Sequence, residues 1–113
     1  SAGAVVDLHW SVDGLRPVGG LPGAGVLAVL PEASCGITET ARVVRWMAGQ
    51  SAGQCGPCRF GLAAVSADLD QLSACRMKSA GLASLKSRLG IIPGRGACRH
   101  PDGVARFAAS AIA

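Results

Sequence analysis

Helical periodicity after Pro31 is the feature that most constrains how this chain can fold. Four stretches repeat apolar residues every three to four positions, the spacing that places them on one face of a helix. The stretches cover 36–52, 57–72, 81–89 and 101–111. Ser34 is suited to a helix N-cap, Pro57 to a first helical turn and Gly90 to a helix end. We therefore predict a mainly α chain in which four short helices form a small antiparallel bundle.

The residues before Pro31 have the composition of strands and turns. Two short apolar runs, 5–10 and 26–30, are separated by clusters of Gly and Pro. Two or three strands do not make a stable sheet alone. We therefore expect residues 1–33 to be a β segment from a larger β unit and residues 34–113 to be the helical domain. Because the chain begins at Ser1 rather than Met, we also expect it to be a fragment or a processed piece.

Composition excludes several classes of protein. With 113 residues, 50% of them hydrophobic and 16% charged, the chain fits one folded domain rather than a disordered segment. No apolar run approaches the ~20 residues that span a bilayer, and the start has no targeting pattern. The net charge of +4 is scattered, and the few aromatic residues lie outside basic clusters. We therefore expect no nucleic-acid binding, no membrane insertion and a cytoplasmic location.

The cysteines point to metal or redox chemistry. Their odd number, five, and the helical pattern are typical of a reducing compartment rather than of a disulfide scaffold. Cys55-Gly56-Pro57-Cys58 falls between the first two predicted helices, and Cys98 falls between the last two. In an up-down bundle these two loops lie at the same end. Three convergent thiolates in Gly- and Pro-rich loops suit an iron–sulfur cluster, because backbone N–H groups there can also reach the sulfides.

Cys35 and Cys75 do not fit the same site. Each is separated from the Cys-x-x-Cys region by the length of a predicted helix. At 1.5 Å per residue, such a helix sets them about 25 Å away. We predict that both are small buried residues at the opposite end of the bundle.

The stretch from Gln50 to Gly61, which reads QSAGQCGPCRFG, resembles the cluster-binding segment of the NADH-binding flavoprotein subunit of respiratory complex I. Related subunits of NAD-linked hydrogenases and formate dehydrogenases share that segment. The family pattern is roughly E-S-C-G-x-C-T-P-C-R-x-G, followed by a fourth cysteine at the position that Cys98 matches. Residues 23–29 also look like the family's G-S-G-G-V-I-V strand. The resemblance runs from about residue 15 to the end, and it implies that residues 1–33 are the tail of a soluble-ligand-binding β-grasp domain.

One cysteine of the family pattern is missing. The family's first cysteine falls on Ala52, so the resemblance carries over only Cys55, Cys58 and Cys98 as ligands. Three thiolates satisfy a [3Fe–4S] cluster. A [4Fe–4S] cluster would need an open iron site or a ligand other than cysteine, for which His100 is the nearest candidate metal ligand. A site that has lost its cluster is the other alternative.

The resemblance implies an electron-transfer part of an oxidoreductase that does no bond-making chemistry itself. The family holds FMN and NADH in an earlier domain, and no glycine-rich segment here has the phosphate-binding pattern. We therefore expect no NADH or FMN site within this chain. The implied partners are other subunits or domains of a redox complex, peripheral to a membrane, and a ferredoxin-like protein. Arg95, Arg99 and Arg106 flank the third cysteine and favour an acidic partner.

Three other functions stay open. Cys-Gly-Pro-Cys is also the tetrapeptide of thioredoxin-like thiol–disulfide oxidoreductases, although Gln54 stands where those proteins usually have Trp. Cys55, Cys58, Cys98 and His100 could form a structural Cys₃His zinc module. A metal-free scaffold in a larger complex is the third.

Overall fold

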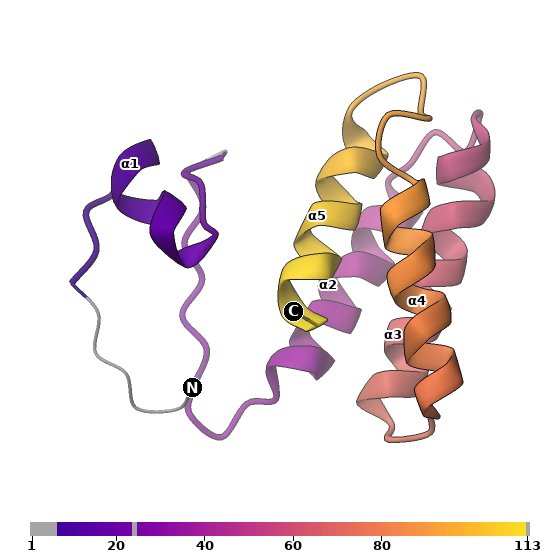
Figure 1. Ribbon diagram of the computed structural model, residues 1–113, viewed down its shortest axis with the longest axis horizontal. Coiled ribbons are helices and arrows are strands. Elements are labelled where there is room, and N and C mark those ends of the chain that lie inside the picture. The colour runs from indigo at the N-terminus through magenta and orange to yellow at the C-terminus, as the bar shows by residue number, and fades with distance from the viewer. Residues whose placement is uncertain (1–6, 24, 113) are drawn as a thin grey trace. The chain divides into compact units, whose positions relative to one another are not determined.

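The structure, a computed structural model, describes residues 7–23 and 25–112 (Figure 1). The chain divides into two compact units, Ser1–Leu30 and Pro31–Ala113. The described residues are mainly helical, as the sequence predicts. Among them, no helix is long and apolar enough to cross a membrane.

The described part of the first unit contains two short helical turns. In α1 (Val12–Leu15), the Ser11 side chain accepts a hydrogen bond of 3.0 Å from the Gly14 N–H and so caps the first turn. η1 (Arg16–Val18) follows and ends at Gly19, whose φ of 76° is favourable only for glycine. In the described part of this unit no residue is buried.

The predicted β segment is not confirmed. Val26–Leu30 has no regular secondary structure, and Val26 and Val29 are 80% and 85% exposed. The other predicted strand lies partly outside the described residues, and its described part, 7–10, is not a strand. A strand needs a neighbour to pair with its N–H and C=O groups, and residues 7–23 and 25–30 supply none.

The second unit consists of helices where the sequence predicts them. They are α2 (Gly36–Gly49), η2 (Pro57–Leu62), α3 (Ala63–Ser73), α4 (Ser79–Ile91) and α5 (His100–Ile112). The N-cap of α2 is Cys35 rather than the predicted Ser34, and α2 ends three residues earlier than predicted. η2 is a π-helical turn that runs directly into α3. Such turns are frequent at functional sites.

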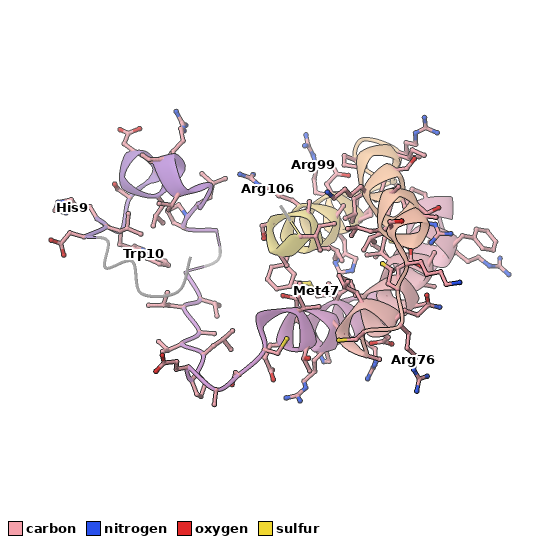
Figure 2. The ribbon with its side chains drawn as sticks, turned by 60° about the horizontal axis from the view of Figure 1, so that its bottom comes forward. His9, Trp10, Met47, Arg76, Arg99 and Arg106 are labelled. Carbon is pink, nitrogen blue, oxygen red and sulfur yellow. The ribbon has the colours of Figure 1, made fainter. Side chains whose placement is uncertain are left out.

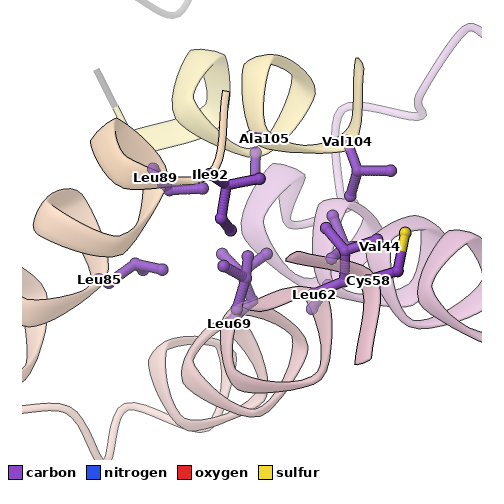
Figure 3. Packing of buried hydrophobic residues seen from close by; sticks show 12 residues of the cluster. Val44, Cys58, Leu62, Leu69, Leu85, Leu89, Ile92, Val104 and Ala105 are labelled. Atoms are coloured by element: carbon purple, nitrogen blue, oxygen red, sulfur yellow. The ribbon is translucent and has the colours of Figure 1, made fainter. Parts of the chain in front are cut away.

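The helices of this unit enclose one core. α2 contacts α3 and α5, α3 contacts α4, and α4 contacts α5. Fully buried side chains from every helix meet between them, as Figure 3 shows for Val44, Leu62, Leu69, Leu85 and Val104. Arg45 with Asp70 and Arg88 with Asp68 form ion pairs on the outside that join α2 to α3 and α4 to α3. Because the arginines of both pairs are exposed to water, the pairs contribute little, and burial of apolar surface dominates the stability.

Two connecting loops meet at one end of the helical unit. Residues 50–56 join α2 to η2, and residues 92–99 join α4 to α5. Figure 1 shows both loops at the same end, while the turn between α3 and α4 lies at the other. The segments that carry Cys55, Cys58 and Cys98 are therefore neighbours in space.

Truncation of Leu69 tests the core. Leu69 is fully buried on α3, so Leu69→Ala is expected to lower the free energy of unfolding by about 2–5 kcal/mol through lost burial and a residual cavity. Val43→Ala, on the exposed side of α2, is the matched control and should change it by less than about 0.5 kcal/mol. Urea unfolding followed by circular dichroism measures the free energy of unfolding of both variants. Equal losses of stability in the two would contradict the placement of Leu69 in the core.

Candidate metal centre

A cavity of about 620 Å³ opens between the two loops. The loop after α2 supplies one wall, and η2 and the loop before α5 supply the rest. Its lining residues are Gln50, Ser51, Ala52, Gly53, Gln54, Cys55, Cys58, Ala97, Cys98 and His100. All four residues predicted to bind metal, and the alanine at the missing family cysteine, therefore line one cavity.

The Cys55–Cys58 pair combines an accessible thiol with a buried one. Pro57 starts η2, and this turn carries Cys58 inward until it is 7% exposed, whereas Cys55 is half-buried. Backbone N–H groups of Ala97 and Cys58 donate to the Cys55 sulfur and lower its pKa. Burial raises the pKa of Cys58, and its thiol donates to the Cys55 sulfur, which raises it further. The negative charges of Cys55 and Cys98 act on Cys58 in the same direction.

The loop that carries Cys98 is held by contacts to the start of α5. The Gly94 N–H donates to Asp102 Oδ1 over 3.0 Å. At Gly96, an added Cβ would lie 2.6 Å from Pro101 Cγ and 3.0 Å from the Cys98 carbonyl oxygen, so only glycine fits. The same loop carries Ala97, whose N–H donates to the Cys55 sulfur. Cys98 itself is exposed.

His100 and Ser51 make the other polar contacts of the cavity. His100 Nε2 lies 2.9 Å from the carbonyl oxygen of Met47, in the last turn of α2. The Ser51 hydroxyl donates to the Cys58 sulfur and partly offsets the rise in that pKa. Ala52 lines the same wall and has no donor atom in its side chain. The wall therefore offers three sulfurs and one imidazole.

Cys35 and Cys75 lie away from this cavity, but the prediction that they are buried is wrong. Both are exposed. Cys35 is the N-cap of α2, where the neighbouring Thr38 hydroxyl and the Thr38 and Ile37 N–H groups lower its pKa. Cys75 follows α3 in a left-handed conformation with φ 57°. Helix ends project into water, and burial of these thiols would need a further covering element.

The residues of the cavity fit an iron–sulfur cluster better than a single metal ion. Thiolates are the ligands that such clusters prefer, and N–H groups directed at sulfur tune them. Among the described residues, no group of three or more His, Cys, Asp or Glu lies close enough to hold one metal ion. In a cluster each thiolate binds a different iron, so three cysteines that do not converge on one point can still serve as ligands.

Sequence patterns do not reveal three contacts of the site. The Ala97 N–H at Cys55 and the Met47 carbonyl at His100 are backbone groups, which any residue type supplies. Ser51 is a common loop residue whose contact with Cys58 depends on the fold of residues 50–54. Only the loop position of Ser51, close before the Cys-x-x-Cys motif, could have drawn attention to it.

The pKa of Cys55 is lowered and that of Cys58 is raised, so the two thiols should react in a measurable order. In the metal-free protein, Cys55 forms a thiolate at lower pH than Cys58, so iodoacetamide is expected to alkylate Cys55 first as the pH rises from about 6 to 10. Mass spectrometry of tryptic peptides follows each residue. The two profiles should coincide in denatured protein, and a Cys58 that reacts first in the folded protein would contradict this geometry.

Comparison with known proteins agrees with the arrangement of these residues. The family described as the NADH-ubiquinone oxidoreductase-F iron-sulfur binding region matches residues 38–113, which is more than half of the chain and includes the whole cavity. No curated protein and no solved structure matches the chain. The resemblance of residues 50–61 to this family is confirmed. The chain therefore belongs to the family of the NADH-ubiquinone oxidoreductase-F iron-sulfur binding region.

Proposed function

We propose that this chain is an iron–sulfur electron-transfer module of an oxidoreductase similar to complex I. One observation carries the proposal: Cys55, Cys58 and Cys98 come from two loops and line one cavity within the family's iron–sulfur-binding region. When bound, an iron–sulfur cluster accepts and releases one electron at a time. The chain's own residues would hold the cluster, shield it on the side of Cys58 and direct N–H groups at sulfur.

The cysteines of the proposed centre leave one coordination position open. Cys55, Cys58 and Cys98 would bind as thiolates, which is sufficient for a [3Fe–4S] cluster. A [4Fe–4S] cluster would have one iron without a cysteine, because Ala52 has no donor atom. The N–H groups of Ala97 and Cys58 already favour the thiolate form of Cys55, so part of the charge stabilisation is present before metal binds.

The proposal also assigns an architecture to the helices and to the residues before them. We take α2, η2–α3, α4 and α5 as an antiparallel four-helix bundle, which the contacts of successive helices and of α2 with α5 support. We take residues 1–33 as the tail of a β-grasp domain. The exposed apolar side chains of Val26, Leu27 and Val29 suit a surface that another part of such a complex covers.

Charge around the cavity indicates the kind of partner. Among the described residues, Arg59, Arg95 and Arg99 lie within two positions of cavity-lining residues along the chain, and all three are exposed. The ion pairs of the described part involve other arginines: Arg42, Arg45 and Arg88. The proposed partners are therefore neighbouring redox subunits and a ferredoxin-like protein with an acidic surface. We place the module in the cytoplasm, peripheral to a membrane complex.

A thiol–disulfide oxidoreductase is the second candidate, and one observation favours it. An accessible Cys55 with a lowered pKa and a buried Cys58 are the pattern of a reactive Cys-x-x-Cys pair. However, the motif follows α2 and a loop rather than a strand, and Cys98 and His100 line the same cavity without a role in that chemistry. Metal analysis distinguishes the two functions.

Replacement of single cysteines tests the proposed centre. Cys55→Ser, Cys58→Ser and Cys98→Ser are each expected to lose most of the iron and acid-labile sulfide of anaerobically reconstituted protein, because each removes one thiolate. Cys35→Ser and Cys75→Ser are matched controls, since both thiols are exposed and absent from the cavity lining, and should retain the wild-type content. Zinc without sulfide, or metal-free protein with reversible Cys55–Cys58 oxidation, would contradict the proposal.

Charge reversal beside the cavity tests the partner. Arg99→Glu is expected to slow reduction of an acidic [2Fe–2S] ferredoxin by about three- to tenfold at low salt, because it weakens electrostatic steering. Arg76→Glu makes the same charge change on the far side of the helical unit from Arg99 (Figure 2) and is the control. Stopped-flow absorbance measures both rates, and the difference should disappear at about 1 M salt. Equal rates for the two variants at low salt would contradict the proposal that the surface around Arg99 binds an acidic partner.

A further inference from the structure

We infer that His100 binds the fourth iron of a [4Fe–4S] cluster through its Nδ1 atom. The inference rests on the proposed function and deepens it, because it completes the ligand set that Ala52 leaves short. It depends on three features: the hydrogen bond of the imidazole, the place of His100 on α5, and the composition of the cavity wall.

The hydrogen bond of His100 determines which ring nitrogen carries the proton. Its partner, 2.9 Å from Nε2, is the carbonyl oxygen of Met47. A carbonyl oxygen can only accept, so Nε2 must donate and carries the proton. In the neutral ring, Nδ1 is then the nitrogen with an available lone pair. A histidine that binds a metal commonly donates its other N–H to a backbone carbonyl in this way.

The backbone holds the ring in this orientation. Met47 lies in the last turn of α2, where its carbonyl oxygen accepts a hydrogen bond of 3.2 Å from the Gln50 N–H. A carbonyl oxygen has two lone pairs, so the second one can accept from the imidazole. His100 begins α5, and the next residue, Pro101, is fully buried, which fixes the start of that helix. Figure 2 shows Met47 on the side of α2 that faces α5. The half-buried imidazole is therefore held between two packed helices.

The cavity wall has a place for a fourth ligand but no fourth thiol. Cys55, Cys58 and Cys98 line the cavity together with Ala52 and His100. Apart from these cysteines, His100 is the lining residue whose side chain binds iron most readily. Neutral imidazole in place of thiolate makes the centre less negative, which raises its reduction potential relative to an all-cysteine centre.

Selective isotope labelling provides a direct test, because the chain contains only two histidines, His9 and His100. The full chain is reconstituted with iron and sulfide, reduced with dithionite, and compared with and without ¹⁵N-histidine by pulsed EPR. We expect a strong nitrogen coupling that changes with the label. His9→Gln should keep this coupling. His100→Gln, whose amide N–H can still donate to the Met47 carbonyl, should lose it and shift the oxidised sample towards [3Fe–4S].

A second variant separates ligation from structural support. In Ala52→Cys a fourth thiolate occupies the position of the missing family cysteine, so the cluster should persist, lose the histidine coupling and have a lower potential. A wild-type cluster without label-dependent coupling, or coupling that survives in His100→Gln, would overturn the inference and leave the proposed function standing. Wild-type protein without iron and sulfide would instead overturn the proposed function. Circular dichroism of the metal-free variants checks that each one folds.

Discussion

Burial of the η2 turn connects the core of the helical unit to the candidate metal centre. Leu62 is fully buried among side chains of the other helices, and Cys58, one turn earlier, is nearly as buried. The same six residues therefore anchor the core and hold a thiol at the cavity. Gly61 permits this packing, because Ile92 lies where an added Cβ would be only 3.1 Å from its Cγ1 atom. A change that loosens the core at η2 also moves Cys58, so under the proposed function stability and metal binding are coupled.

Electrostatics in the cavity follows from the same arrangement. Cys58 resists ionisation because it is buried and lies near two other sulfurs, while backbone N–H groups favour the thiolate of Cys55. Three neighbouring thiolates without a cation repel one another, and metal ions relieve that repulsion. Ionisation of all three thiols is therefore unfavourable in the metal-free protein and becomes favourable once metal is bound.

The sequence predicted the elements of the helical unit well, and the details of the site less well. Apolar periodicity located the helices, because side chains such as Leu69 and Leu85 must face one core. Loop topology correctly brought Cys98 near Cys55 and Cys58. Exposure of Cys35 was missed, since an isolated small residue carries no periodic signal. The bond from His100 to Met47 could not be predicted, because it needs the distance between two helix ends far apart in sequence.

The contact between the first and last helices of this unit has a consequence for biosynthesis. α2 packs against α5, and the cavity takes its second wall from residues just before α5. While the ribosome has made only the segment up to α4, Cys55 and Cys58 are present without Cys98 and His100. Under the proposed function, cluster insertion would therefore have to wait until α5 has been synthesised and has docked. Until then the nascent chain carries a reactive thiol pair, which a chaperone or a reducing cytosol would need to protect.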